Sequence, residues 1–239
     1  MKLAIIGYGK MGKEIEQAAR ERNHTIELIV DINNLSELND QRLKSVDVAI
    51  EFTHAEVAYS NCMACFHAGV PVVCGTTGWN NKLTELKQIC LPKGYGLFHT
   101  PNFSIGMNLF FRINKLLAKL MDHQPSYNVS ITEIHHTQKL DAPSGTAIRL
   151  ADDILQSISR KKKWKLDEQD SADTIAIYAV REGMVPGIHT IRYESEIDFI
   201  EMTHSAKNRK GLALGAVIAA EFMKDKKGFF TMDDLLQFT

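Results

Sequence analysis

Two adjacent histidines and a lysine occur within five residues, directly before a turn of small polar residues. The whole segment reads Glu133-Ile134-His135-His136-Thr137-Gln138-Lys139-Leu140-Asp141-Ala142-Pro143-Ser144-Gly145-Thr146-Ala147. Histidine and lysine side chains both titrate, so either type can deliver a proton to a reacting group. The same residues could instead bind a metal, hold an anion, or simply end a strand and begin a helix.

A metal site is the first alternative for this segment. If residues 129–135 form a strand, His135 and His136 point to opposite faces and do not readily bind one metal ion. Only Asp141 lies nearby as a further ligand, and the segment has no cysteine to complete a tetrahedral set. The sequence therefore predicts no metal site here.

An anion site is the second alternative. Pro143 and Ser144 suit the first turn of a helix, with proline preset for the turn and a hydroxyl able to cap it. Such a helix start has no ligand in the simplest interpretation. In the functional interpretation, the amides of Gly145 and Thr146, the Thr146 hydroxyl and the charge of Lys139 bind a substrate carboxylate. Both interpretations remain open from these residues alone.

A glycine-rich turn near the start of the chain predicts a second kind of chemistry. It reads Gly7-Tyr8-Gly9-Lys10-Met11-Gly12 and lies between a predicted strand, residues 2–6, and a predicted helix, residues 13–22. The three glycines permit a tight turn, close approach of a pyrophosphate and close packing of helix on strand. The free amides and the helix dipole favour phosphate charge, so we expect a bound dinucleotide.

An acidic residue lies where the ribose of that dinucleotide would be. Asp31 ends the next predicted strand, residues 25–30, nineteen residues after Gly12. Its carboxylate can accept hydrogen bonds from both ribose hydroxyls, and it would repel the extra phosphate of NADP. Ile32 supplies no cation to receive that phosphate. We therefore expect NADH as the preferred cofactor, with NADPH possible.

Two further turns follow predicted strands at the edge where such sheets bind ligands. They are Gly75-Thr76-Thr77-Gly78 and Thr100-Pro101-Asn102-Phe103. Either could contact the nicotinamide half of the cofactor. Taken alone, each is equally an ordinary turn.

The elements that must position these residues change character along the chain. Strands at residues 46–52, 70–74 and 96–99 alternate with helices, and Thr53 with Glu56 resembles a capping box. This alternation predicts a doubly wound parallel sheet of the Rossmann type. After a long helix at residues 106–121, strands at 129–135, 174–181, 189–195 and 198–204 have few helices between them, which predicts an open mixed or antiparallel sheet. A helix at 211–223 and a short element at 229–238 follow.

Composition excludes several classes of protein. The 239 residues include 28 basic and 29 acidic side chains, a near balance that argues against nucleic acid as the main partner. The first residues lack the features of a signal peptide, and no apolar run is long enough for a membrane span. We expect the basic run at residues 160–165 to form a solvated loop.

The four cysteines do not change this assessment. Cys62 and Cys65 are separated by two residues, but Cys74 follows too soon for a usual zinc ribbon. Cys90 stands apart, and the surroundings of the pair are apolar, as expected for buried structural thiols. We therefore expect a reduced, cytoplasmic protein.

Several motifs together resemble bacterial dihydrodipicolinate reductase, an enzyme family of the diaminopimelate and lysine pathway. The segment from Glu133 to Ala147 closely resembles the family signature. Similarity continues through GYGKMG, EFTHAE, GTTG, PNFSIGMNL and REGMVPG, and so covers nearly the whole chain. Two stretches, between Asp31 and Asp47 and between Pro186 and Met202, are shorter than in longer members of the family.

The resemblance implies a two-domain α/β protein. Residues 1–105 and 210–239 would form the dinucleotide-binding Rossmann domain, and residues 106–209 a central α+β domain for substrate binding and assembly into a homotetramer. The implied reaction transfers hydride from NAD(P)H to an unsaturated cyclic imine bearing two carboxylates, 4-hydroxy-tetrahydrodipicolinate, and yields tetrahydrodipicolinate.

The resemblance also implies roles for individual residues. His135 matches the proton donor and Lys139 the second catalytic residue, which also binds substrate. His136, Gly145 and Thr146 match positions that hold the substrate carboxylates. The implied cofactor contacts are Gly7, Met11, Gly12, Asp31, Gly75, Thr77, Thr100 and Phe103.

Two other functions compete with this one. Another two-domain nicotinamide oxidoreductase acting on a small carboxylic acid would explain the first hundred residues, but not the segment from Glu133 to Ala147. A non-catalytic NADH-sensing regulator would need a DNA-reading element, and the chain has neither a helix-turn-helix with basic flanks nor positive net charge.

Overall fold

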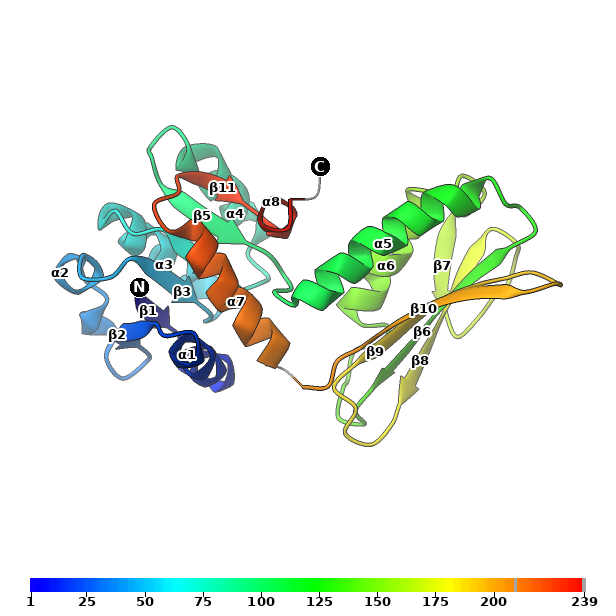
Figure 1. Ribbon diagram of the computed structural model, residues 1–239, viewed down its shortest axis with the longest axis horizontal. Coiled ribbons are helices and arrows are strands. Elements are labelled where there is room, and N and C mark those ends of the chain that lie inside the picture. The colour runs from blue at the N-terminus through cyan, green and yellow to red at the C-terminus, as the bar shows by residue number, and fades with distance from the viewer. Residues whose placement is uncertain (209, 238–239) are drawn as a thin grey trace. The chain divides into compact units, whose positions relative to one another are not determined.

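The chain divides into two compact units. The computed structural model describes residues 1–208 and 210–237. Unit 1 contains Met1–Ile105 and Lys210–Thr239, and unit 2 contains Gly106–Arg209. Figure 1 traces the chain through unit 1, into unit 2 and back to unit 1.

Unit 1 is built on one parallel sheet. Its strands are β1 (Lys2–Ile6), β2 (Thr25–Val30), β3 (Val48–Glu51), β4 (Val72–Cys74), β5 (Gly96–His99) and β11 (Gly228–Phe230). They lie in the order β11-β5-β4-β3-β1-β2, and every neighbouring pair is parallel. The order reverses between β1 and β3, which places the ligand crevice of such a sheet at their carboxyl ends. The predicted doubly wound parallel sheet is confirmed.

Helices cover both faces of this sheet. They are α1 (Lys10–Glu21), α2 (Asp40–Leu43), α3 (Ala55–His67), α4 (Asn80–Cys90), α7 (Lys210–Met223) and α8 (Met232–Leu235), with a 3-10 turn at Leu35–Glu37. In β1, Leu3 and Ile5 pack into one core with side chains of α1 and α7, while Ala4 and Ile6 pack into another with α3 and α4. Because both faces are buried, these strands read as continuous apolar runs rather than as an alternation.

Unit 2 contains a mixed sheet and two helices. The strands are β6 (Asn128–His135), β7 (Lys163–Leu166), β8 (Thr174–Arg181), β9 (Ile188–Glu194) and β10 (Phe199–Ser205). Their order is β10-β9-β6-β8-β7, with β6–β8 and β7–β8 parallel and the other two pairs antiparallel. The helices are α5 (Ile105–Asp122) and α6 (Gly145–Leu155) (Figure 1). A second, mixed sheet was expected here and is observed.

One face of this second sheet forms the core of unit 2. Along β6, every second residue is buried, and Val129 and Ile131 pack with Phe111 and Leu150 from the two helices. The same alternation turns Glu133 and His135 toward the helices. The central strand thus presents an acid and a histidine on its buried face, at its carboxyl end.

The basic run is not the solvated loop that we expected. Lys163–Leu166 forms strand β7, and Lys161 is only 3% exposed. Its ammonium group donates to the Asn128 Oδ1 atom at 2.6 Å and to the carbonyl oxygens of Ala172 and Thr174 at 2.7 and 2.9 Å. Three acceptors meet the hydrogen-bonding demand of the buried charge, which is why a lysine can occupy the position.

The expected state of the cysteines agrees with their surroundings. Cys62, Cys65, Cys74 and Cys90 are free thiols and fully buried. Burial raises the pKa of the Cys90 thiol to about 11, so this group is an uncharged thiol at neutral pH. Among the described residues, no helix combines the length and the apolar character that crossing a membrane requires.

Candidate active site

The glycine turn lies at the carboxyl end of β1, where its sequence placed it. Gly7 has φ +95°, and a Cβ atom there would be 2.0 Å from the carbonyl oxygen of Phe52, so only glycine fits. The N-cap of α1 is Gly9, and a Cβ atom added to it would meet nothing within 4 Å. The start of α1 is therefore open on the side where a phosphate would bind.

The predicted ribose-binding acid lies beside this turn. Asp31 follows β2 directly, and the amide of Gly7 donates to the carbonyl oxygen of Val30 at 2.8 Å. One carboxylate oxygen, Oδ1, accepts from the amide of Asn33 at 2.7 Å. The next side chain, Ile32, is 85% exposed and carries no charge. The loop therefore offers a carboxylate and, at Ile32, no cation.

A cavity of about 360 Å³ opens at the carboxyl ends of the central strands. It is lined by Met11, Phe52, Thr53, His54, Ala55, Gly75, Thr76 and Thr77. The structure thus brings Met11 of the glycine turn together with the Gly75–Thr77 segment. The segment from Thr100 to Phe103 does not line this cavity.

A buried acid organises the cavity and was missed in the sequence. Glu51 is fully buried at the end of β3, and its carboxylate accepts from Thr76 Oγ1 at 2.8 Å, from Cys74 Sγ at 3.0 Å and from the Thr53 hydroxyl. Thr76 Oγ1 also accepts from the amide of Thr53 at 2.8 Å. Glu51 therefore joins the two loops that line the cavity. An acid that ends an otherwise apolar strand was the available signal.

Thr53 does not cap the following helix, contrary to expectation. The N-cap of α3 is His54, and its side chain makes no capping hydrogen bond. The Thr53 hydroxyl donates to Glu51 instead. A hydrogen bond from a hydroxyl group to a carboxylate is stronger than one from a backbone amide to a hydroxyl oxygen. The contact of Thr53 with Glu51 is therefore favoured over a cap.

Two side chains of the segment after β5, those of Thr100 and Phe103, are buried. The Thr100 side chain is 4% exposed, and its hydroxyl donates to the carbonyl oxygen of Asn102 at 3.0 Å. The Phe103 ring lies in the core, 5.4 Å from the Phe52 ring and 5.9 Å from the Phe98 ring. Any contact of Phe103 with a cofactor would therefore use its backbone, and Pro101 is the exposed side chain of this turn.

In unit 2, three side chains and one backbone amide converge on one buried carboxylate. Glu133 is fully buried, and both of its oxygens lie 3.1 Å from the amide of Ser144. Arg181 donates to Oε1 at 3.1 Å. His135 Nδ1 and His189 Nε2 lie 3.6 and 3.7 Å from Oε2.

The two histidines of this cluster have perturbed proton affinities. Burial lowers the pKa of His135, and the charge of Glu133 opposes part of that effect. Burial also lowers the pKa of His189, to about 4, so His189 is neutral at physiological pH. A lowered pKa makes protonated His135 a readier proton donor than a solvated histidine.

Glu133, His135 and His189 also place three potential metal-ligand atoms within 4.8 Å of one another, among the described residues. The guanidinium group of Arg181 already neutralises this carboxylate, and the Ser144 amide donates to it. The Glu133 carboxylate therefore already has an ion-pair partner and a backbone donor.

The predicted catalytic lysine lies beside an acid. Lys139 Nζ is 2.7 and 2.8 Å from the two carboxylate oxygens of Asp141. This interaction holds the pKa of Asp141 below its usual value. His136 follows the end of β6, and its Nδ1 atom is buried without a hydrogen-bond partner among the described residues.

The start of α6 combines both interpretations of its sequence. Ser144 is the N-cap, and its hydroxyl oxygen accepts from the amide of Ala147 at 3.1 Å. The amides of Gly145 and Thr146 lie in the first turn, where no intrahelical acceptor exists. Gly145 is exposed, and a Cβ atom there would meet nothing within 4 Å. A capped helix start and an open anion site are therefore compatible.

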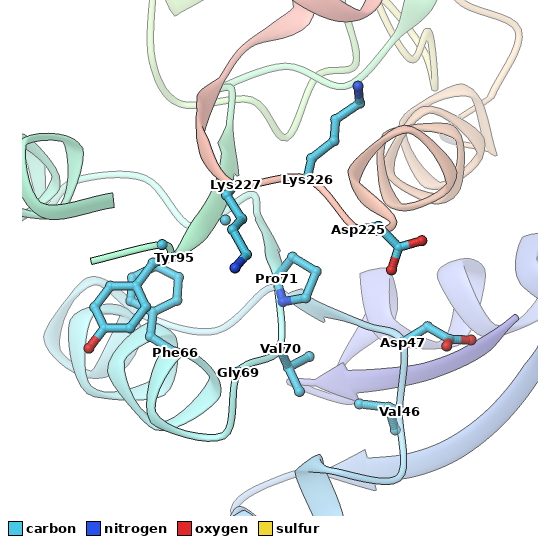
Figure 2. Close-up of a pocket in the computed structure, with 12 residues that line it drawn as sticks. Val46, Asp47, Phe66, Gly69, Val70, Pro71, Tyr95, Asp225, Lys226 and Lys227 are labelled. Atoms are coloured by element: carbon cyan, nitrogen blue, oxygen red, sulfur yellow. The ribbon is translucent and has the colours of Figure 1, made fainter. Parts of the chain in front are cut away.

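A larger cavity, of about 460 Å³, lies at the other end of the unit 1 strands, away from their carboxyl ends (Figure 2). It adjoins the amino ends of β3, β4, β5 and β11, and none of the predicted site residues line it. Its aromatic wall is the stacked pair Phe66 and Tyr95, with ring centroids 4.6 Å apart. Asp47 in its lining accepts from the amide of Lys2 at 2.7 Å, a contact that ties β1 to β3.

Comparison with known proteins covers both units. Residues 1–103 match the family model described as "Dihydrodipicolinate reductase, N-terminus", and residues 106–236 match "Dihydrodipicolinate reductase, C-terminus". A 4-hydroxy-tetrahydrodipicolinate reductase of Christiangramia forsetii is 50% identical over 99% of this chain and 98% of that protein. One of Archaeoglobus fulgidus is 32% identical over 99% of this chain and 100% of that protein.

A solved structure has the same architecture. It is a dipicolinate-bound dihydrodipicolinate reductase from Paenisporosarcina sp. TG-14, with a TM-score of 0.80 and 26% sequence identity. The similarity covers 97% of each chain.

Proposed function

Since the chain belongs to the dihydrodipicolinate reductase family, we propose that it reduces 4-hydroxy-tetrahydrodipicolinate to tetrahydrodipicolinate with NAD(P)H. This step belongs to diaminopimelate and lysine biosynthesis. The observation that carries the proposal is the 50% identity to a 4-hydroxy-tetrahydrodipicolinate reductase along the whole chain. The proton-donating and anion-binding groups of unit 2 support it independently.

Unit 1 holds the dinucleotide in this proposal. The turn from Gly7 to Gly12 binds the pyrophosphate through its amides, and Asp31 accepts from the ribose hydroxyls. NADH is preferred, because Asp31 repels a 2′-phosphate and the exposed Ile32 offers no compensating cation. The nicotinamide end lies at Gly75, Thr76 and Thr77 in the 360 Å³ cavity, with the turn from Thr100 to Phe103 as further contacts. A bound cofactor supplies the hydride.

Unit 2 holds the substrate. The amides of Gly145 and Thr146 and the Thr146 hydroxyl bind one carboxylate at the start of α6. His136 and Lys139 bind carboxylate charge from the other side of the turn, and the substrate competes with Asp141 for the Lys139 ammonium group. The dipicolinate bound to the Paenisporosarcina enzyme is also a small ring with two carboxylates, which supports this assignment.

Proton transfer completes the reduction. Hydride adds to the unsaturated ring, and the enamine that results takes a proton from His135, with Lys139 assisting as an acid. The lowered pKa of His135 favours donation of this proton. Fixed cations beside the bound carboxylates are most effective where water is excluded, and His135 is 7% exposed.

We also expect a cytoplasmic homotetramer. The face of the unit 2 sheet away from its helices exposes Tyr178, Val180 and Phe199, at 39, 42 and 53%. Tyr178 and Val180 lie on β8 and Phe199 lies on β10 of the same sheet, so this face offers apolar surface for pairing of copies. The four buried free thiols suit a reducing compartment. Size-exclusion chromatography with light scattering tests the assembly.

A direct assay tests the proposed reaction. Freshly made 4-hydroxy-tetrahydrodipicolinate should cause loss of NADH absorbance, whereas sugars and amino acids should not. Variants His135→Ala and Lys139→Ala should lose turnover but bind NADH as the wild type does, because their residues belong to the other unit. Absence of turnover with the wild-type protein would contradict the proposal.

A further inference from the structure

We propose that Glu133 is a positioning residue that serves the proton donor and the substrate carboxylate site at once. One carboxylate orients the His135 ring and fixes the Ser144 amide that precedes the open amides of α6. The inference rests on the proposed function, because it takes His135 as the proton donor.

Glu133 lies where it can orient the His135 ring. Glu133 and His135 are two residues apart on the same face of β6, and Nδ1 lies 3.6 Å from Glu133 Oε2. Nδ1 is buried and has no hydrogen-bond partner among the described residues. The opposite ring nitrogen, Nε2, faces Gly187. A carboxylate at Nδ1 keeps the proton of the neutral ring there, and leaves Nε2 to exchange a proton with substrate.

The distance of 3.6 Å exceeds that of a formed hydrogen bond. Catalytic hydrogen bonds are often long without ligand and shorten when substrate binds. Protonation of His135 would itself strengthen the attraction, since it converts a dipole into a cation beside a carboxylate. Glu133 therefore acts most strongly on the form of His135 that donates the proton.

Glu133 also contacts the start of α6. The Ser144 amide lies 3.1 Å from both oxygens of Glu133, and the Ser144 hydroxyl caps Ala147. The same hydroxyl lies 3.3 Å from His189 Nε2. Any shift of Glu133 must therefore move Ser144, and with it the neighbouring amides of Gly145 and Thr146.

The stability of protonated His135 depends on the charge of the Glu133 carboxylate. His135 is faced by Glu133 from its own strand, by Arg181 from β8, by His189 from β9, and by Lys139 and Asp141 from the following loop. His189 is neutral, so two acids balance two cations. Without the charge of Glu133, the cations outnumber the remaining acid and protonated His135 becomes less stable.

The variant Glu133→Gln separates the two roles. Its carbonyl oxygen can still accept from Ser144 and Arg181, while its amide group presents N–H in place of the carboxylate oxygen facing His135 Nδ1. We expect kcat to fall about 10- to 100-fold, with the KM for substrate changed less than about 3-fold. Glu133→Ala removes both contacts, so the KM should also rise, by about 10-fold or more.

The matched control is Asp153→Asn. Asp153 is a buried carboxylate of α6 in the same unit, 5% exposed and paired with Lys115 at 3.2 Å. It has no contact with Glu133 or His135 among those described. The control should retain the kcat and KM of the wild type even if its melting temperature falls. A loss equal to that of Glu133→Gln would overturn the positioning role.

Two further measurements do not depend on the size of the activity loss. In Glu133→Gln, the fall of kcat with rising pH should begin about one pH unit lower than in the wild type. Nitrogen-15 NMR of the wild-type protein should find the neutral His135 ring protonated on Nδ1. Protonation on Nε2 overturns the proposal, even if neither Glu133 variant folds.

The outcomes separate this proposal from the proposed function. If the wild-type protein turns over the substrate and Glu133→Gln keeps its kcat, KM and pH profile, Glu133 has no positioning role. If the wild-type protein does not turn over the substrate, the proposed function fails. The NMR measurement then still decides whether Glu133 sets the state of His135.

Discussion

Gly187 lies against the Nε2 edge of the His135 ring, where an added Cβ atom would be 3.1 Å from Nε2. Glycine therefore leaves open the side of His135 that faces away from Glu133. The backbone at Gly187 also has φ +155°, which other residues rarely adopt. The two ring nitrogens therefore have different surroundings, Nδ1 beside Glu133 and Nε2 beside Gly187.

Gly187→Ala should therefore impair catalysis specifically. The added methyl group occupies the space beside Nε2, so kcat/KM for the substrate should fall about 10-fold or more, which corresponds to about 1.4 kcal/mol. The affinity for NADH should not change. Gly183→Ala is the matched control, because Gly183 also has positive φ, +46°, but a Cβ atom there meets nothing within 4 Å. Equal losses in the two variants would contradict a role in access to His135.

His189 should make the stability of the protein depend on pH. Its pKa is about 4 in the folded state, whereas an unfolded histidine has about 6.5. The unfolded chain then binds more protons than the folded one between these values. This stabilising contribution is complete above pH 6.5 and is lost as the pH falls toward 4. The full shift corresponds to about 3 kcal/mol.

Urea unfolding of His189→Gln and of the wild type at pH 7 and pH 5 measures this effect. Because other groups titrate as well, the informative quantity is the difference between the two proteins at each pH. The free energy of unfolding of the wild type should decrease more between pH 7 and pH 5 than that of the variant. Parallel decreases would show that His189 is not the buried neutral group.

Lys161 should be a determinant of the stability of unit 2. Lys161→Met removes the donor from three acceptors, the buried carbonyl oxygen of Thr174 and the partly buried oxygens of Asn128 and Ala172. Leaving such groups without a partner should lower the free energy of unfolding by about 2–4 kcal/mol. The control is the neighbouring exposed Lys162, which donates to the carbonyl oxygen of Ser159. Lys162→Met should change the free energy of unfolding by about 0.5 kcal/mol or less. Similar destabilisation by both would contradict the buried role.

The burial of Lys161 is a feature that the local sequence pattern did not predict. The run around it is locally indistinguishable from a solvated loop, because its acceptors lie as far away as Asn128. By contrast, the bounds expected for β5 and β8 agree with the structure, since these short apolar segments end at clear turn signals. The local sequence pattern determines where strands form. Contacts with residues distant in the sequence determine which charged side chains are buried.

The cluster around Glu133 follows the same rule. Its position on the face of β6 that carries His135 follows from the alternation of a strand. Its other partners, Ser144, Arg181 and His189, come from three different segments, and only the fold brings them together. The sequence therefore indicated His135 and the helix start as candidate site features, but not the acid that contacts both.

Cofactor preference should depend on Asp31 and Ile32. The wild type should have a higher kcat/KM with NADH than with NADPH. Asp31→Ser with Ile32→Arg removes the repelling charge and adds a cation on an exposed position, so the preference should shift toward NADPH by about 10-fold or more. Steady-state kinetics with both cofactors measure the ratio. An unchanged ratio would mean that the adenosine ribose does not bind at Asp31.

The two loops that line the cavity of unit 1 should depend on Thr76 for their positions. Thr76 Oγ1 accepts from the Thr53 amide and donates to Glu51, both at 2.8 Å, so Thr76→Val breaks both contacts at nearly constant volume. The two loops should then lose their fixed positions, and the Kd for NADH should rise about 10-fold, as measured by fluorescence titration. Thr84→Val is the control, because Thr84 is exposed and its hydroxyl donates to the Asn80 carbonyl oxygen within α4. Wild-type affinity in Thr76→Val would indicate that the cofactor does not depend on this pair of loops, and the assignment of the cavity to the nicotinamide would have to be abandoned.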